Sequence, residues 1–587
     1  MQSDIRDKKD NLLTLWRRVR PFMSAHRGMY AVTIFLTLLT LGTSVAFPQM
    51  IRAVIDEGIQ AGAVDRVYFW LWAMSALVIV QASAQYLRNF VLAKGSIRIT
   101  TEIRAYILRQ AFDQEFAFFD KKESDLLPNR LMADIGTLQN VVGTIVPEIV
   151  QGGLRLFIAG GLMIYTSPLL SVAVAMIGPT LAYGSSKISR RIRRQADPIQ
   201  AAGARLTSRT RESLSGVLTV KTYDHQEKTI EEHNQLAQNL IDTARPQMKS
   251  NAFLTGYTNL LSEGAVVVAI SVGAMLILSN QLTPGLLVTF ILYAGLVSRG
   301  AATVSEQSAQ LMSAQGSTNT LFALAERETK MPPVETPEPK ECRGAIEVQS
   351  VHFSYPEGRE FAAVKGVDFS IKAGEEVALV GVSGCGKSTL AKLICRLYDP
   401  DQGKICLDGH PLPEINTRWL RSKISLVPPE PVIFTTTLAE NIRYGRTDAT
   451  DEEVRWAAEQ AQAAGFIEEL PEAYETIAED AGAQFSSGQR QRIAIARAIL
   501  RRAQILILDE STAALDTRTE SEVKKSLRAL PHNPTLILIS HRLSTIVDVE
   551  RVIALDQGRI VASGPHHELL KTSHFYSELV QDQLITE

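Results

Sequence analysis

GVSGCGKST, residues 381–389, is the stretch that decides how the second half of the chain folds. The preceding EEVALVG has the consecutive apolar residues of a strand buried on both faces of a parallel sheet. The following STLAKLICRLYD has helical periodicity. A glycine loop between a strand and a helix holds phosphate oxygens with backbone amides and the helix N-terminus. The stretch therefore predicts a phosphate-binding loop.

The side chains of this loop predict a nucleotide site with magnesium. We expect Lys387 to reach the β- and γ-phosphates and Ser388 to ligate Mg²⁺. A second apolar strand, QILILDE at residues 504–510, ends in Asp509, which would hold the magnesium shell, and Glu510, which would orient or deprotonate an attacking water. With ATP and Mg²⁺ as cofactors, the expected nucleotide-binding residues are Gly381, Ser383, Gly384, Cys385, Gly386, Lys387, Ser388, Thr389 and Asp509.

The stretch FSSGQRQRIAIARAIL, residues 485–500, predicts a second phosphate-binding element. Ser486 and Ser487 can cap a helix whose N-terminus carries partial positive charge. Gly488 lets a phosphate approach the backbone closely. This helix needs a phosphate of its own, but the sequence contains one phosphate loop, so a second copy of the chain is expected to supply it.

The first half of the chain has a different character. The chain has 587 residues and a net charge of −2, which gives no indication of nucleic-acid binding. Its mean hydropathy of +0.03 averages long apolar runs before residue 300 with a second half typical of a soluble α/β domain. A helix crosses about 30 Å of hydrocarbon with about 20 residues. The predicted spans lie near residues 29–51, 68–88, 145–165, 168–186, 264–281 and 285–303.

Basic residues predict the orientation of these spans. Arginines at 17, 18, 20 and 27 precede the first span, and a basic cluster from Lys187 to Arg194 follows the fourth. The short connections after spans one, three and five are nearly free of basic residues. The positive-inside rule then places both termini and both long connections in the cytoplasm.

Residues 11–23, NLLTLWRRVRPFM, have apolar side chains near one helical face and arginines beside it. This pattern fits a helix that lies on the inner membrane surface. It fits equally well an ordinary first turn that leads into the first span.

The two long connections, residues 89–140 and 187–260, keep helical periodicity and are predicted to continue the spans into the cytoplasm, with turns near 116–131 and 213–224. The Pro-rich stretch MPPVETPEPK, residues 331–340, predicts a linker. The expected domains are an interfacial helix, a transmembrane domain with six spans, a linker and a nucleotide-binding domain, at residues 1–28, 29–325, 326–344 and 345–587.

Together these residues resemble the ABC transporter family, and the order of domains resembles its exporter type. The resemblance extends from about residue 11 to about residue 580. It implies an all-α transmembrane domain with long cytoplasmic helix extensions, followed by an α/β P-loop ATP-binding cassette. FSSGQ is similar to the signature sequence of the family, usually LSGGQ, and places Ser486, Ser487, Gly488 and Gln489 against the partner's nucleotide, with Ser487 replacing a glycine.

Further motifs carry the resemblance through the second half. STAALD, residues 511–516, is similar to the D-loop and ends in Asp516. ISHRLST, residues 539–545, supplies His541 as the switch histidine that senses the γ-phosphate. Tyr355 in FSYP resembles the aromatic residue that stacks on adenine. TIAED, residues 476–480, resembles the exporter x-loop, with Asp480 in its last position.

The resemblance implies a dimer of two such chains, or of this chain with a paralogue, with two ATP molecules sandwiched between the phosphate loop of one subunit and the signature of the other. Closure would push on the tips at 116–131 and 213–224 and turn an inward-facing cavity outward. Among bacterial members the chain resembles multidrug and lipid exporters, including lipid-A flippases. The implied function is ATP-driven export or flipping of a hydrophobic or amphiphilic substrate, such as a lipid or drug, across the inner membrane.

One position departs from the family pattern. ISLVPPEPVIF, residues 424–434, resembles the Q-loop but has Pro429 where the family has a glutamine that reaches the magnesium and the attacking water. Proline has no polar side-chain atom and no backbone N–H. Either catalysis persists but is slow or differently coupled, or the chain is a partly degenerate partner in a heterodimer.

Polar residues within the spans are the available indication of the cargo. Charged groups inside a membrane are costly and usually face a cavity or a partner. Substrate contact, an ion pair or helix–helix packing would each explain the polar residues of these spans. A non-transporting ATP switch is the competing function, which the base Glu510 disfavours. The residues are Gln81, Gln85, Arg88, Glu148, Gln151 and Arg155.

Overall fold

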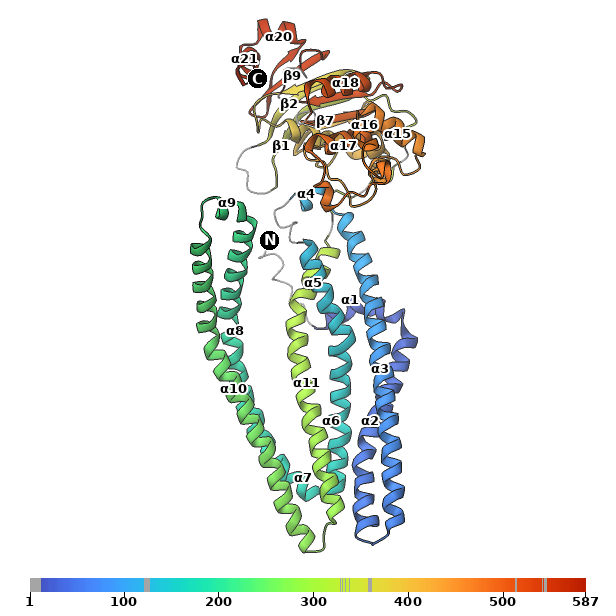
Figure 1. Cartoon of the computed structure of the whole chain (residues 1–587), viewed down its shortest axis with the longest axis vertical. Coiled ribbons are helices and arrows are strands. Elements are labelled where there is room, and N and C mark those ends of the chain that lie inside the picture. The colour runs from blue at the N-terminus through green and yellow to red at the C-terminus, as the bar shows by residue number, and fades with distance from the viewer. Residues whose placement is uncertain are drawn as a thin grey trace. The chain divides into compact units, whose positions relative to one another are not determined.

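The computed structural model describes residues 12–586 apart from 121–126, 328, 330, 333, 337, 357–361, 512–514, 541 and 543–545. The chain forms two compact units (Figure 1). The first contains Met1–Gln110 and Asn129–Glu326, and the second contains Ala111–Pro128 and Arg327–Glu587. Each unit is described separately.

The first unit is entirely helical within its described residues. Short helices precede or connect the long ones. Two π-helical stretches lie within the described residues, Val54–Ile59 after α2 and Val141–Ile145 before α6. The helices are α1 Leu12–Ser24, α2 Arg27–Ala53, α3 Val64–Phe112, α5 Leu127–Asn140, α6 Val146–Thr166, α7 Pro168–Ala175, α8 Ile177–Ser215, α9 Val217–Thr222, α10 Gln226–Leu278 and α11 Pro284–Ala325.

Six stretches within the described residues are long and apolar enough to cross a membrane. Five contain a predicted span, and the fifth ends at Leu278, three residues before the predicted end at 281, so the six spans are confirmed. They are Arg27–Ile59, Val64–Phe112, Met132–Thr166, Pro168–Ser215, Gln226–Leu278 and Pro284–Ala314. At 1.5 Å per residue, α3 and α10 are each about 70–80 Å long, more than twice the hydrocarbon thickness. The expected helix extensions are therefore present.

Turn chemistry marks where these helices begin. The hydroxyl of Ser167 accepts from the backbone N–H of Leu170 and is followed by Pro168 at the start of α7. Thr283 caps α11 in the same way through the N–H of Leu286, and Pro284 follows it. A capping hydroxyl followed by proline at the first helical position satisfies an orphan donor and fixes a helical φ angle.

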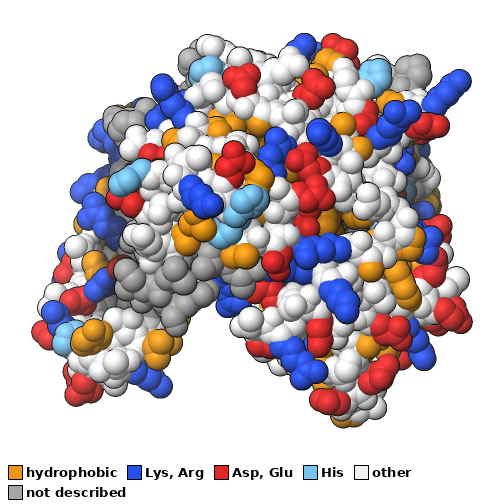
Figure 2. Space-filling view, turned by 90° about the horizontal axis from the view of Figure 1, so that it is seen from above, with side chains coloured by type: hydrophobic (Ala, Val, Ile, Leu, Met, Phe, Trp, Pro, Cys, Tyr) orange, Lys and Arg blue, Asp and Glu red, His pale blue; other side chains and the backbone are white. Residues whose placement is uncertain are grey.

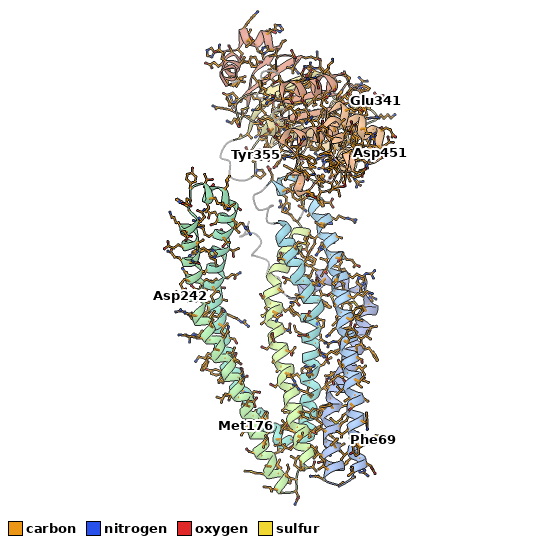
Figure 3. All side chains as sticks on the ribbon, in the orientation of Figure 1. Phe69, Met176, Asp242, Glu341, Tyr355 and Asp451 are labelled. Atoms are coloured by element: carbon orange, nitrogen blue, oxygen red, sulfur yellow. The ribbon has the colours of Figure 1, made fainter. Side chains whose placement is uncertain are left out.

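The helices of the first unit pack through small residues and present large apolar side chains outward. A Cβ on Gly300 of α11 would lie 2.8 Å from the backbone oxygen of Gly152 on α6, so close approach of these helices requires glycine. Phe69, near the start of α3 (Figure 3), is 65% exposed. Figure 1 shows α8 and α10 running together as a pair that leans away from α6 and α11 toward its α9 end.

The second unit is an α/β domain with two sheets. A six-stranded sheet has the order β10-β9-β3-β8-β7-β6, and its four inner neighbour pairs, from β9 to β6, are parallel. A four-stranded antiparallel sheet has the order β2-β1-β4-β5. The strands are β1 Ile346–Phe353, β2 Val364–Ile371, β3 Glu376–Val380, β4 Gln402–Leu407, β5 His410–Pro411, β6 Ile424–Val427, β7 Ile505–Asp509, β8 Thr535–Ile539, β9 Arg551–Asp556 and β10 Arg559–Gly564.

Helices cover both faces of the six-stranded sheet. The helices of the second unit are α4 Phe116–Phe119, α12 Lys387–Ile394, α13 Thr417–Lys423, α14 Leu438–Arg443, α15 Asp451–Gln460, α16 Ala464–Glu468, α17 Ser487–Leu500, α18 Thr517–Arg528, α20 His566–Thr572 and α21 His574–Thr586. The expected fold class is confirmed in both units. Figure 2 shows acidic and basic side chains interspersed over one face of the second unit.

Alternate residues of the buried strands contribute to two separate cores. Val377 and Leu379 of β3 pack in the cluster that contains Leu390 and Ile394 of α12. Ala378 and Val380 pack in the cluster that contains most of α17. Because successive side chains of a strand point to opposite faces, α12 and α17 lie on opposite faces of the sheet.

Candidate nucleotide-binding site

The loop between β3 and α12 has a backbone that only glycine tolerates at three positions. Gly381, Gly384 and Gly386 have φ angles of 144°, 81° and 108°. A Cβ on Gly381 would lie 2.1 Å from the backbone oxygen of Leu555, and one on Gly386 would lie 2.5 Å from that of Ala363. The loop is therefore held tightly against neighbouring backbone while its N–H groups lead into α12, as a phosphate cradle requires.

Lys387 and Ser388 are the first residues of α12, and both hydrogen-bond across the loop. The Lys387 ammonium donates to the backbone oxygens of Gly381 and Val382 at 2.8 and 3.0 Å. The Ser388 hydroxyl donates to Oδ1 of Asp509, at the end of β7, at 3.0 Å. A hydroxyl and a carboxylate that already touch offer the oxygen ligands that Mg²⁺ prefers, so these residues fit the expected cation.

Asp509 is almost fully buried, and this burial raises the pKa of its carboxyl group. The hydrogen bond from Ser388 lowers this pKa, and the charge of Glu510 raises it. The site therefore holds an acidic side chain that gains by binding a cation, because a cation compensates for the lost hydration.

Glu510 has a left-handed backbone with φ of 49°. Its backbone N–H donates to the oxygen of Ile539 on the neighbouring strand β8 at 2.9 Å. A non-glycine residue in this region carries strain, and such strain concentrates at functional sites. The strained residue is the one predicted to act as the base.

Tyr355, the predicted adenine-stacking residue, lies beside the start of α12. Its hydroxyl is 3.1 Å from the Thr389 hydroxyl. Its ring meets Phe353 and Tyr398 edge-on, with centroids 5.1 and 5.5 Å away, and the Lys392 ammonium lies 5.6 Å from its centroid. The aromatic side chain is thus fixed next to the phosphate loop.

The predicted signature forms the exposed N-terminus of α17. The Ser486 hydroxyl accepts from the N–H of Gln489 at 3.2 Å, and Gln489 Oε1 accepts from the N–H of Ser486 at 2.9 Å. This capping box satisfies two helix donors. The N–H groups of Ser487 and Gly488 point the same way with the helix dipole. The signature belongs to the opposite sheet face from α12, so one chain does not bring its own phosphate loop and signature together.

Pro429 lies in the exposed segment after β6. Its backbone oxygen accepts a hydrogen bond from Gln491 Nε2 at 3.1 Å, although its side chain has no polar atom. Oε1 of Gln491 is buried without a hydrogen-bond partner in the part of the chain that the structure describes. The segment is therefore anchored to α17 through its main chain.

Some predicted site residues lie outside the described residues. They include His541 and three residues of the STAALD motif, 512–514. Asp516, which follows, caps α18 by accepting from the N–H of Thr519 at 3.0 Å, and these hydrogen bonds lower the pKa of its carboxyl group. Asp480 begins a single 3-10 turn, Asp480–Gly482.

The resemblance implies that closure pushes on the first predicted tip, but the sequence did not predict which residues join this tip to the site. Asp120, directly after α4, accepts from the Tyr398 hydroxyl at 2.7 Å and lies 3.6 Å from the Lys392 ammonium. Phe116 of α4 meets the Tyr398 ring edge-on, with centroids 5.8 Å apart. Tyr398 also contacts Tyr355, so it links α4 to the nucleotide-side aromatic residue. Neither Tyr398 nor Asp120 belongs to a motif that would have revealed this.

The polar residues of the spans mostly contact neighbouring helices. Arg88 of α3 donates to Gln151 of α6, and Gln81 of α3 donates to Ser44 of α2 at 3.0 Å. Gln85 is exposed. Arg155 of α6 is within electrostatic reach of Glu148 and of Arg299 on α11.

Two family models match the chain, one for the ABC transporter transmembrane region at residues 30–300 and one for ABC transporter at residues 364–513. The chain is 33% identical over 578 residues to the mouse ATP-binding cassette sub-family B member 10, mitochondrial, covering 97% of this chain and 80% of that protein. It is 30% identical to an ATP-dependent lipid A-core flippase of Chromobacterium violaceum, covering 97% and 98%.

The fold agrees with these relatives. A solved bacterial Atm1-family ABC exporter with ATP bound superposes with a TM-score of 0.83 at 26% identity, covering 95% of this chain and 98% of that chain. The match includes the helical and the α/β parts. The matching exporter was solved with ATP, the nucleotide that the phosphate loop predicts. The chain is therefore a multi-pass membrane protein of the ABC transporter family, of the exporter type, and couples ATP hydrolysis to transport.

Proposed function

We propose that this protein exports or flips a hydrophobic or amphiphilic substrate, such as a lipid or a drug, across a bacterial inner membrane by alternating access. The observation that carries the proposal is the contact of Ser388 with Asp509 beside the strained Glu510, next to a glycine loop that has no room for a side chain at Gly381 or Gly386. Ser388 and Asp509 would hold Mg²⁺, which would neutralise phosphate charge when bound. Both termini are assigned to the cytoplasm by the basic residues that flank the spans.

The partner in this proposal is a second copy of the chain. Because α12 and α17 cover opposite faces of one sheet, the signature of one copy serves the phosphate loop of the other. The tip around α9 supports this arrangement, since Leu218 and Tyr223 are 78% and 70% exposed there. Exposed apolar side chains on a helical tip are suited to docking on a second subunit.

The charges within the spans favour a substrate with an anionic group. Arg88, Arg155 and Arg299 share their surroundings with one carboxylate, Glu148. The Nε atom of Arg155 is buried and has no hydrogen-bond partner among the described residues. An excess of positive charge surrounded by apolar helices suits an amphiphile that carries phosphate or carboxylate groups.

The test is ATP turnover of the purified protein in lipid, compared with Glu510→Gln. Wild-type turnover that is inhibited by vanadate, stimulated by an amphiphile and abolished in Glu510→Gln would support the proposal. Nucleotide binding by the variant, measured in parallel, controls for loss of folding. Turnover well above background that is equal in both proteins would contradict the assigned base.

A second candidate is a partly degenerate subunit of a heterodimeric exporter, which Pro429 favours. In that case the purified chain alone binds ATP but turns over no faster than Glu510→Gln, and activity requires a paralogue that copurifies. The same assay therefore separates the two functions.

A further inference from the structure

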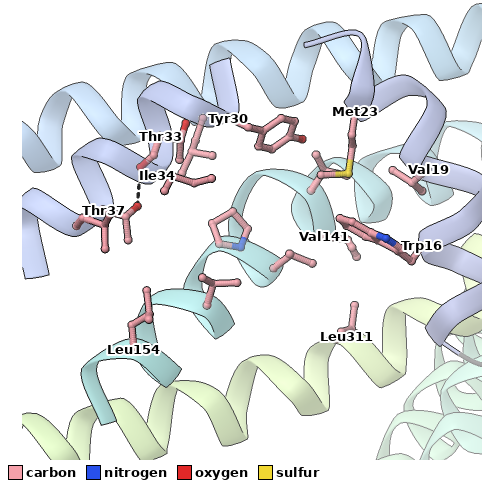
Figure 4. Close-up of a pocket in the computed structure, with 16 residues that line it drawn as sticks. Trp16, Val19, Met23, Tyr30, Thr33, Ile34, Thr37, Val141, Leu154 and Leu311 are labelled. Atoms are coloured by element: carbon pink, nitrogen blue, oxygen red, sulfur yellow. Dashed lines mark hydrogen bonds between the residues drawn. The ribbon is translucent and has the colours of Figure 1, made fainter. Parts of the chain in front are cut away.

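A pocket of about 350 Å³ lies in the first unit, between α1, α2 and α6 (Figure 4). Trp16, Val19 and Met23 of α1 line it, together with side chains of α2 and α6 and single leucines of α3 and α11. None of its sixteen lining residues, all of which the structure describes, is charged. The pocket opens to the surface of the first unit, since its lining residues Trp16 and Ile34 are 47% and 60% exposed.

The hydroxyl groups of this pocket are satisfied with one exception. Thr33 and Thr37 donate to backbone oxygens of their own helix at 2.9 and 2.7 Å, the latter drawn in Figure 4, so they present methyl groups. The Tyr30 hydroxyl is buried and has no hydrogen-bond partner among the described residues. A buried, unpaired hydroxyl in an apolar pocket suits a ligand that has a long hydrocarbon part and an oxygen acceptor.

Cations stand beside the pocket on the elements that line it. Arg20 lies four positions after Trp16 and three before Met23 on α1, and Arg27 lies three before Tyr30 on α2, so both share the helical faces that line the pocket. Both are exposed. Arg18 faces the other side of α1 and is bound to Glu326.

We propose that this pocket binds one acyl chain of an anionic phospholipid from the surrounding bilayer leaflet, with the headgroup phosphate against Arg20 and Arg27 and the Tyr30 hydroxyl donating to an ester oxygen. The pocket has an apolar lining and two exposed arginines beside it, and an acyl chain joined to an anionic headgroup complements both features. An amphipathic helix rich in arginine lies at the headgroup boundary, where such a lipid is available. Arg88, Arg155 and Arg299, which we assigned to the transported substrate, do not line this pocket.

Quenching of Trp16 fluorescence by brominated lipid measures occupancy of the pocket. In a variant with Trp70→Phe and Trp72→Phe, Trp16 is the remaining tryptophan of the first unit. Nanodiscs of phosphatidylcholine would contain increasing fractions of phosphatidylglycerol or phosphatidylcholine with brominated acyl chains, and quenching of fluorescence would be recorded without nucleotide. Trp16→Phe in the same background gives the signal of Trp419 and Trp456.

The expected result is quenching that saturates at a low fraction of brominated phosphatidylglycerol and not of brominated phosphatidylcholine. Filling the pocket with Val150→Phe should abolish saturation, whereas Ile158→Phe, on the same helix outside the pocket, should not. Arg20→Gln and Arg27→Gln should each raise the half-saturating fraction about five-fold, with Arg17→Gln as the control. Tyr30→Phe, which preserves packing, should also weaken binding.

Two results would overturn the proposal. Quenching that rises linearly and equally with both brominated lipids, unchanged by Val150→Phe, would mean bulk lipid contact only. Protection of Trp16 from both lipids, lost when the oligomer is dissociated, would mean that a second copy covers the pocket. Neither readout requires ATP turnover, so each is independent of the proposed transport function.

Discussion

At the scale of single residues, the site combines side chains fit for ATP hydrolysis with one that is not. Ser388, Asp509 and Glu510 lie together, whereas Pro429 offers only its backbone oxygen, which Gln491 already engages. A family glutamine at 429 would add an amide group in a segment that already has an anchored main chain. The structure therefore predicts a site that is assembled but lacks one polar group.

Replacing Pro429 with Gln should raise ATP turnover about 10- to 100-fold, because a positioned polar group near the attacking water typically contributes at least this much. Pro431→Gln changes the same residue type two positions along the segment and should leave the rate unchanged. Turnover would be measured in lipid at saturating ATP. Equal rates for wild type and Pro429→Gln would show that position 429 does not limit hydrolysis.

The pH dependence of magnesium binding should depend on Glu510. Burial and the charge of Glu510 raise the pKa of Asp509, and a protonated carboxyl does not ligate Mg²⁺. Magnesium-dependent ATP binding should thus be lost as pH falls. The loss should occur at a pH above the pKa of an ordinary aspartate side chain. Glu510→Gln removes a like charge, lowers this pKa and should move the loss to lower pH. Titrations of nucleotide binding with and without Mg²⁺ test the shift, and a shift to higher pH would contradict it.

At the scale of elements, the short helix α4 connects a long helix extension to the nucleotide-side aromatic residues. Glu115, just before α4, accepts from Arg327 at 2.7 Å and from Thr329 at 3.1 Å. These hydrogen bonds hold the start of α4 against the first residues of Arg327–Glu587, the longer of the two stretches that form the second unit. Asp120 and Phe116 then contact Tyr398. A movement of Tyr398 is therefore transmitted directly to the helix that follows α3.

Tyr398→Phe should reduce the stimulation of ATP turnover by substrate while leaving ATP binding intact. The variant keeps the ring contact with Phe116 but removes the hydroxyl that donates to Asp120, a bond to a charged group worth about 1.5–3 kcal/mol before screening by solvent. Tyr444→Phe is the matched control, since Tyr444 is exposed in the same unit. An unchanged ratio of stimulated to basal turnover would exclude this role.

Local patterns predicted most of these elements, and non-local packing accounts for the rest. The six spans and the loop between β3 and α12 follow from apolar run length and glycine spacing, which are properties of adjacent residues. The π-helical stretches at 54–59 and 141–145 carry no such signal. The contact of Asp120 with Tyr398 joins residues 278 positions apart, so no local pattern reports it. The roles of His541, Tyr355 and the signature residues remain predictions.

At the scale of the whole molecule, the two faces of the six-stranded sheet separate functions that must meet at one nucleotide. The phosphate loop leads into α12 on one face, and the signature begins α17 on the other. We infer that a complete site needs a second nucleotide-binding unit, from another copy of this chain or from a paralogue. This requirement is a property of the fold and does not depend on the substrate.

Cross-linking between differently tagged copies tests this requirement. One copy carries Ser383→Cys and the other Ser487→Cys, both exposed positions, in the Glu510→Gln background. A short bifunctional maleimide should join the two tags in the presence of ATP and Mg²⁺, and much less without nucleotide. As a control for the native cysteines, each variant is mixed with a chain that carries neither introduced cysteine. A product formed within one chain, or equally without ATP, would contradict the arrangement.

The assembly of the second unit from two stretches of chain has a consequence for biosynthesis. Asp120 leaves the ribosome 278 residues before Tyr398, its partner. At 5–20 residues per second, this delay is roughly 15–60 seconds. During that time four further spans must insert while residues 111–128 wait without their docking surface. The nascent chain therefore exposes Phe116 and its neighbours to chaperones and proteases at least until about two-thirds of the chain has been translated, and quality control can monitor whether this late docking has occurred.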